Sequence, residues 1–86
     1  KPLLIDVREP AEYGLDSVDG FINIPRGVLE IKMPELCDDE GRCILLHCGT
    51  GGRAALSAKA LRSMGYNNVH LISASFEEIK KHFQRS

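Results

Sequence analysis

The chain has 86 residues, of which 43% are hydrophobic, and its formal net charge is −1. This length accommodates one domain, which we expect to span residues 1–86 around a core of modest size. Positive and negative side chains are interspersed, so the sequence does not indicate a nucleic acid or a membrane surface as a partner. The longest purely apolar runs contain three residues, far too few to cross a bilayer.

Three cysteines, Cys37, Cys43 and Cys48, are odd in number and irregularly spaced. They therefore predict neither a disulfide framework nor a metal site. Cys43 and Cys48 bracket a predicted strand, which would hold their Cα atoms roughly 16 Å apart, whereas a disulfide needs about 4.4–6.8 Å. Thiols favour a reducing compartment, so we expect a cytoplasmic location, or a periplasmic one if a signal peptide has been removed before Lys1.

In chain order, segments of strand-like and helical pattern alternate. Four apolar segments predict strands, at residues 3–7, 21–24, 43–47 and 69–72. Helical patterns predict a short turn at 9–13, helices at 27–36 and from about 52 to 64, and a last helix from 75 onward. This alternation predicts an α/β fold, with a small, mostly parallel sheet of about four strands in a three-layer α/β/α arrangement.

Apolar spacing within the helical segments predicts which faces are buried. In the segment 27–36 the expected apolar positions are Val28, Leu29, Ile31 and Leu36. Pro34 is expected to break or restart that helix. In the long helix the expected apolar positions are Leu56, Ala60, Leu61 and Met64. Gly65 follows them as the expected C-terminal cap. Ser75 and Glu78 have the spacing of a capping box for the last helix.

The stretch "HCGTGGR", residues 47–53, joins the third predicted strand to the long helix. Cys48 is the first residue beyond the carboxyl end of that strand, where ligands bind in open α/β sheets. Gly49, Gly51 and Gly52 allow the backbone to curl and to turn its N–H groups inward as a nest for an anion. Thr50 is the one nearby side chain that could cap the helix, whose N-terminus attracts negative charge.

This setting is typical of a nucleophilic cysteine. A helix N-terminus lowers a cysteine pKa from about 8.5 toward roughly 3.5–7.5, and Arg53 adds a permanent positive charge. The pattern therefore predicts a Cys48 thiolate that carries a charged adduct inside a ring of donors. The structural alternative is a buried, inert cysteine beside a glycine turn.

The string resembles two known signatures. His-Cys followed by five residues and Arg is the phosphate-binding signature of cysteine phosphatases, but only four residues separate Cys48 from Arg53. Four intervening residues are typical of rhodanese-type sulfurtransferases. "LLIDVREPAEY" resembles the opening signature of that family, "VDGFINIP" resembles its "IPGAINIP", and "LRSMGYNNVHLI" resembles the stretch that follows its active-site helix. The sequence is thus similar to rhodanese-like domains over nearly its whole length.

The resemblance implies sulfur transfer through a Cys48 persulfide, with no metal or organic cofactor. Thiosulfate, a polysulfide or another persulfide would donate the sulfur, and a thiol or cyanide would accept it. The implied substrate-binding residues are Gly49, Thr50, Gly51, Gly52 and Arg53. Asp6 would support the loop by accepting hydrogen bonds, and Arg8 would anchor an acidic partner such as Glu12.

Some features depart from the family pattern. The family's first strand is absent, and Ala74-Ser75 and Ile79 replace its Gly-Gly and nearby Trp. Because the loop carries no cation except Arg53, we favour a persulfide or polysulfide over the thiosulfate dianion. A protein persulfide is a further candidate partner, and we expect a monomer.

Two other functions stay open: a non-catalytic sulfur-carrier or interaction module, and a cysteine phosphatase or arsenate reductase. The remaining candidate residues have structural interpretations. His47 is expected to be a packed histidine, and Cys37 and Cys43 to be structural, with Cys37 the better candidate for a resolving thiol.

Overall fold

The computed structural model describes residues 1–49 and 52–83. The elements of this part follow one another as β1 (Leu3–Asp6), α1 (Pro10–Leu15), β2 (Ile22–Asn23), the 3-10 helix η1 (Arg26–Val28), α2 (Leu29–Leu36), β3 (Ile44–His47), α3 (Gly52–Ser63), β4 (Val69–Leu71) and α4 (Phe76–Phe83). The α/β fold predicted from the alternating pattern is confirmed. Of the described helices, none is long and apolar enough to cross a membrane.

The four strands form one sheet in the order β2-β1-β3-β4, and every pairing between them is parallel. Asp6 at the end of β1 lies in register with His47 at the end of β3. The carboxyl ends of the two central strands therefore meet at one edge of the sheet, and the residues that follow them come together there.

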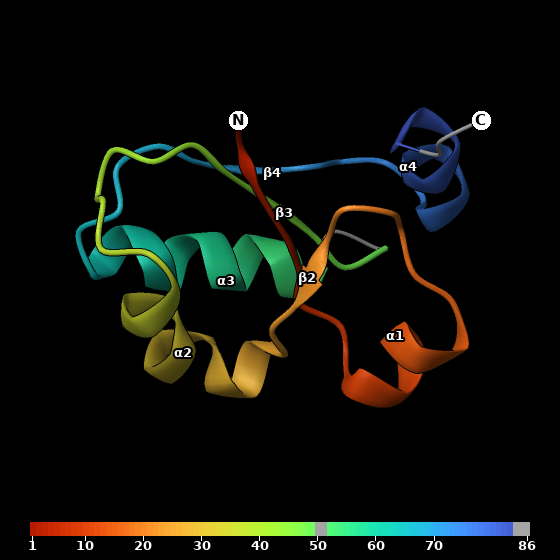
Figure 1. Cartoon of the computed structure of the whole chain (residues 1–86), viewed down its shortest axis with the longest axis horizontal. Coiled ribbons are helices and arrows are strands. Elements are labelled where there is room, and N and C mark those ends of the chain that lie inside the picture. The colour runs from red at the N-terminus through yellow and green to blue at the C-terminus, as the bar shows by residue number, and fades with distance from the viewer. Residues whose placement is uncertain (50–51, 84–86) are drawn as a thin grey trace.

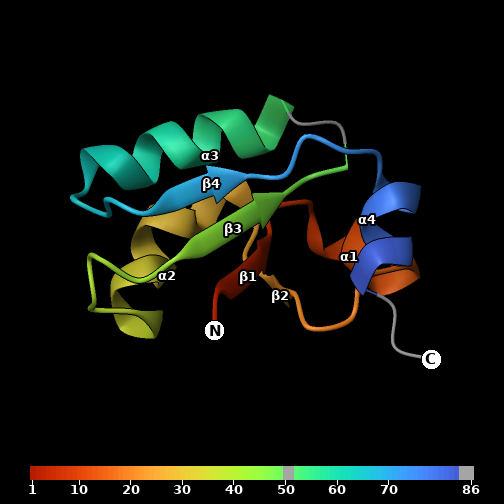
Figure 2. The ribbon, with the colours of Figure 1, turned by 90° about the horizontal axis from the view of Figure 1, so that it is seen from above.

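Two apolar clusters hold the layers together. The larger one joins one face of the sheet to α2 and α3, with residues such as Ile5, Leu46, Leu29, Met33 and Leu61. The smaller one lies on the opposite face, where Ile79 of α4 is buried with Val18 and Phe21. Figure 1 and Figure 2 show α2 and α3 together on one side and α1 and α4 grouped toward one end. Helix α4 thus covers the second face close to the carboxyl ends of the strands.

Two predictions about helix faces are only partly right: Leu29 and Leu61 are buried as predicted, but other predicted positions are not. In α2 the buried positions are Leu29 and Met33, whereas Ile31 is 71% exposed. In α3 the buried positions are Ala54, Ser57, Ala58 and Leu61, and Leu56 is 54% exposed. The small side chains of Ala54 and Ala58 allow α3 to approach the sheet closely, so this face is buried in preference to the one with the larger Leu56.

Pro34 neither breaks nor restarts its helix, because α2 runs through it from Leu29 to Leu36. Since Pro34 lies in the second turn of a short helix, the missing N–H removes a single backbone hydrogen bond. The helix ends at Cys37, whose N–H donates to the carbonyl of Met33 at 2.9 Å. The predicted cap of α4 is confirmed, since the N–H of Glu78 donates to Ser75 Oγ and the N–H of Ser75 donates to Glu78 Oε1.

Gly65 lies just after the end of α3 and has a left-handed backbone conformation, with φ of 107°. We expect Gly65→Ala to lower the free energy of unfolding by about 1–2 kcal/mol, because a Cβ strains this conformation. The added Cβ would also lie 2.5 Å from Glu40 Oε2, which must then move. Urea unfolding measures the effect. Gly14→Ala is the control, since Gly14 lies within α1 with open space around it and should raise the stability by up to about 1 kcal/mol.

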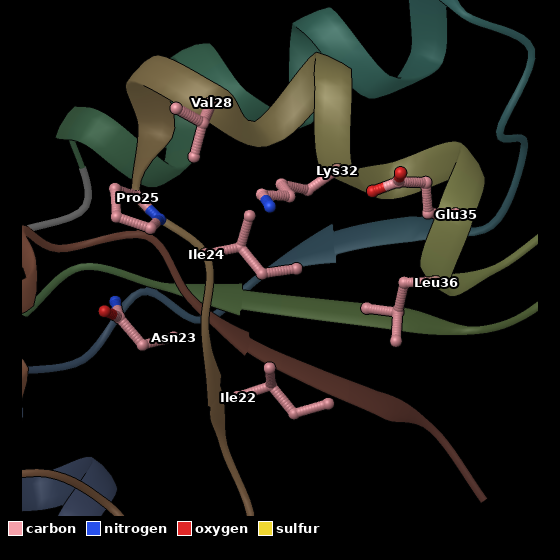
Figure 3. A pocket seen from close by; sticks show the side chains of 8 residues that line it. All are labelled: Ile22, Asn23, Ile24, Pro25, Val28, Lys32, Glu35 and Leu36. Carbon is pink, nitrogen blue, oxygen red and sulfur yellow. The ribbon is translucent and has the colours of Figure 1, made fainter.

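A shallow apolar groove of about 320 Å³ lies along the edge of the sheet, between β2 and α2. Figure 3 shows Val28 near one end of it and Leu36 at the other, with Lys32 close to Ile24 between them. Of residues 47–49, 52 and 53, none lines this groove. The chemistry predicted for Cys48 therefore belongs to a different part of the surface.

Candidate active site

Cys48 lies where the sequence predicts it, directly after the last residue of β3. Its side chain is 2% exposed, and Sγ accepts a hydrogen bond of 3.2 Å from the backbone N–H of Ala54. Ala54 is the third residue of α3, so the donor is one of the N–H groups that the first turn of a helix leaves without an intrahelical partner. A charge-assisted bond at the positive end of a helix favours the thiolate form of a cysteine.

The turn after Cys48 depends on glycine. Gly49 has a φ of 83°, and a Cβ placed there would lie 3.6 Å from Cβ of Phe76. The left-handed backbone, more than the space, therefore requires a residue without a side chain at this position. Gly52 opens α3, as predicted. The predicted binding residues Thr50 and Gly51 lie outside the described residues.

Arg53 lies beside Cys48 but is held by a carboxylate. Its Nη1 and Nη2 donate to Glu12 Oε1 and Oε2 at 2.6 and 3.1 Å, and Nη2 also lies 3.4 Å from the carbonyl oxygen of Cys48. Glu12 additionally accepts from the N–H of Glu9 at 3.0 Å, in the capping box that starts α1. Arg53 thus ties the cysteine loop to α1. The predicted pairing of Arg8 with Glu12 is wrong.

These bonds fix the charges of the pair. The hydrogen bond with Arg53, followed by that with the backbone of Glu9, lowers the pKa of Glu12 to about 2. The same bond to Glu12 raises the pKa of Arg53 above its ordinary value, and the charge of Cys48 acts in the same direction. Both side chains are therefore ionised at neutral pH. The guanidinium faces one carboxylate with two parallel bonds, which is the favoured geometry for this ion pair.

Arg8 forms an ion pair with Asp6. Arg8 Nε and Nη2 lie 2.9–3.1 Å from the Asp6 carboxylate, and the N–H of Arg8 donates to Asp6 Oδ1 at 2.9 Å. Arg8 Nη2 also donates to the carbonyl of Asp16 at 2.7 Å, and its guanidinium lies 4.4 Å from the centre of the Phe76 ring. Asp6 and Arg8 therefore order the segment that follows β1, next to the cysteine loop.

His47 is packed on the face of the sheet opposite to Cys48, as its place on the strand predicts. Its ring is fully buried and meets the ring of Phe21 edge-on at 4.7 Å. Nε2 lies 3.3 Å from Asp6 Oδ2, in a contact that lacks the alignment of a strong hydrogen bond. Phe76 completes this layer at 6.1 Å from the His47 ring. Residues on both faces of the sheet thus support the turn at Cys48.

The buried carboxylate predicts an acid-sensitive stability. Burial raises the pKa of Asp6, but the contacts with His47 and Arg8 outweigh it and lower the pKa to about 2 from 3.8. A lowered pKa in the folded state means that ionised Asp6 stabilises the fold above pH ~4 and that this stabilisation is lost as the pH falls toward ~2. We expect roughly 2 kcal/mol of stability to depend on it.

The measurement is the free energy of unfolding of the wild-type protein and of Asp6→Asn from pH ~5 to ~2. The difference between the two proteins should shrink by about 2 kcal/mol over this range. Asp38→Asn, which alters an exposed carboxylate, is the matched control. A difference between wild type and Asp6→Asn that stays constant with pH would contradict the assigned ion pair.

The structure therefore brings together Cys48, Gly49, Gly52 and Arg53 at the carboxyl edge of the sheet, with Asp6 and Arg8 beside them. Within residues 1–49 and 52–83, no group of three or more His, Cys, Asp and Glu side chains could hold a metal ion. Phe76 was missed at the sequence level, and Glu12 was assigned to the wrong arginine. Glu12 pairs with Arg53, and Phe76 contacts both Gly49 and Arg8.

The fold is that of a known class of domains. A family model described as the rhodanese-like domain matches residues 1–82, and the chain belongs to this family. The protein is 31% identical over 65 residues to thiosulfate sulfurtransferase PspE of Escherichia coli, which covers 76% of this chain and 62% of that protein. It is 27% identical to thiosulfate:glutathione sulfurtransferase of Saccharomyces cerevisiae, over 93% of this chain and 66% of that protein.

The structural similarity is close. A solved structure described as rhodanese with anions from E. coli superposes with a TM-score of 0.83 at 26% identity, covering 92% of both chains. Among curated relatives, the chain spans 62% of PspE and 61% of a sulfurtransferase of Allochromatium vinosum. The chain therefore spans less than two thirds of the length of these two curated relatives.

Proposed function

We propose that the protein transfers a sulfane sulfur through a persulfide on Cys48. The observation that carries this proposal is the bond from the Ala54 N–H at the start of α3 to Cys48 Sγ. It holds a nucleophilic sulfur at a positive helix end, and the same dipole stabilises the negative charge of a persulfide. The E. coli and yeast relatives, named for thiosulfate as a substrate, support the same reaction class.

The reaction proceeds in two displacements. The Cys48 thiolate attacks the sulfane sulfur of the donor, the S–S bond of the donor breaks, and the remaining donor fragment leaves with the electron pair. The acceptor, a thiolate or cyanide, then attacks the outer sulfur of the Cys48 persulfide. Cys48 leaves as the thiolate, which completes the cycle without a change in net oxidation state. Small sulfur donors, or a protein persulfide, are the partners that this cycle needs.

The test is turnover with cyanide as the acceptor, followed as the formation of thiocyanate. We expect repeated turnover with at least one sulfane donor and no hydrolysis of a generic aryl phosphate. Loading of sulfur without turnover would instead favour a sulfur-carrier module. Hydrolysis of the phosphate ester would favour a cysteine phosphatase. We further propose a cytoplasmic location, because Cys37 and Cys43 are free thiols. We also propose that the protein is a monomer.

A further inference from the structure

Three cations near the cysteine end of the sheet are already neutralised. Each of three cationic side chains there forms an ion pair with a carboxylate, at 2.6–2.9 Å: Arg53 with Glu12, Arg8 with Asp6, and Lys80 with Asp16. Lys80 belongs to this set because its Nζ lies 6.0 Å from the Phe76 ring, which packs beside Gly49. Within the described part of the chain, the surroundings of Cys48 therefore offer little uncompensated positive charge.

Arg53 shows this compensation most clearly. Both of its terminal nitrogens face the two oxygens of Glu12, and the low pKa of that carboxylate keeps it ionised at neutral pH. The negative charge of Glu12, 2.6 Å from Arg53 Nη1, thereby compensates the positive charge of Arg53. Arg26 and Glu9 are both exposed, so solvent screens their charges.

Among the described residues, apolar side chains also lie near the site. Leu56, three residues beyond Arg53 on α3, is 54% exposed, and half-buried Phe76 lies against the turn at Gly49. Residues three apart lie on the same side of a helix. An organic group can pack against such side chains, whereas an inorganic dianion gains nothing from them.

We propose that the donor for Cys48 is the persulfide of an organic thiol and that Glu12 sets this preference against thiosulfate. This inference rests on the proposed function. The Cys48 thiolate attacks the terminal sulfur of R–S–SH, the S–S bond breaks, and R–S⁻ leaves with the electron pair, so that Cys48 becomes the persulfide. At neutral pH such a donor carries one negative charge at most on its sulfurs. It therefore needs less positive charge at the site than the thiosulfate dianion.

The experiment measures the second-order rate constant for loading sulfur onto the protein, by intact mass, with two donors: thiosulfate and the persulfide of 2-mercaptoethanol. Three proteins are compared: wild type, Glu12→Gln and Glu40→Gln. Glutamine removes the negative charge, and its single amide oxygen can still accept from Arg53 Nη1 and from the Glu9 N–H, which both bind Oε1, while the bond from Nη2 to Oε2 is lost. Glu40 lies before β3, at the opposite end of that strand from Cys48, and its substitution changes the net charge equally.

We expect wild type to load faster from the persulfide. Glu12→Gln should raise the rate constant for loading from thiosulfate by about 5- to 10-fold. The rate constant for loading from the persulfide should change by less than about twofold. Glu40→Gln should leave both within about twofold. The proposal is overturned if Glu12→Gln leaves the thiosulfate constant unchanged, if Glu40→Gln raises it equally, or if wild type loads faster from thiosulfate.

A second measurement needs no variant. The loading of wild type by thiosulfate should change little with ionic strength, because the net charge of the site is near zero. A rate that falls steeply with added salt would show an uncompensated positive charge and overturn the proposal. If neither donor loads sulfur onto Cys48, the proposed function itself fails, which separates the two conclusions.

Discussion

Replacing Cys48 by serine is expected to abolish sulfur transfer, with a loss of at least about 10³-fold in turnover. A serine hydroxyl stays protonated at neutral pH and cannot hold a sulfane sulfur, so both displacements are lost. The substitution exchanges one small buried side chain for another and keeps an acceptor for the Ala54 N–H, so the fold should persist. Thiocyanate formation gives the activity, and thermal unfolding verifies the fold.

The two remaining cysteines provide the controls for this variant. Cys37 is buried, with Sγ 3.5 Å from the carbonyl of Asp39, and Cys43 precedes β3 at the opposite end of the strand from Cys48. Serine at either position should leave turnover within about twofold of wild type, because neither sulfur lies at the carboxyl edge of the sheet. Substantial turnover by Cys48→Ser would mean that another residue carries the sulfur.

Arg53→Ala is expected to have the second largest effect, a loss of about 10- to 100-fold in turnover with either donor. The variant removes the two bonds to Glu12 and the contact with the carbonyl of Cys48, and it leaves an unpaired carboxylate beside the thiolate. Loss of order in the loop and repulsion of anionic donors both act against the first displacement. Initial rates with thiosulfate and with a persulfide measure the effect.

Lysine at position 53 should restore little of this activity, because an ammonium group cannot form two parallel bonds with one carboxylate. Arg62→Ala is the matched control, since Arg62 lies on the same helix and binds the carbonyl of Val69 at 2.7 Å, away from Cys48. Turnover by Arg53→Ala equal to that of wild type would contradict the role assigned to the bridge between α1 and the loop.

The local signals in the sequence predict the parts of the site that depend on neighbouring residues. An apolar run followed by glycines and a helical pattern is sufficient to place Cys48 after a strand and Gly52 at a helix start. The partners of Arg53 and Arg8 could not be predicted in the same way. Glu12 and Arg53 are 41 residues apart, and only the register of the sheet and the position of α1 bring them together.

The errors on helix faces have a related cause. Periodicity shows that a helix has an apolar side, but the choice between two apolar sides depends on which one fits the neighbouring layer. In α3 the narrow side with Ala54 and Ala58 fits against the sheet and leaves Leu56 outside. This packing also places an exposed apolar side chain three residues beyond Arg53.

The most direct test of sulfur transfer through Cys48 is the intact mass of the protein after incubation with a sulfane donor. Thiosulfate and the persulfide of 2-mercaptoethanol are used in separate samples, with Cys48→Ser treated identically. We predict a gain of one sulfur atom, reversed by cyanide and absent from the variant. No gain from either donor, or an equal gain in Cys48→Ser, would contradict a persulfide on Cys48.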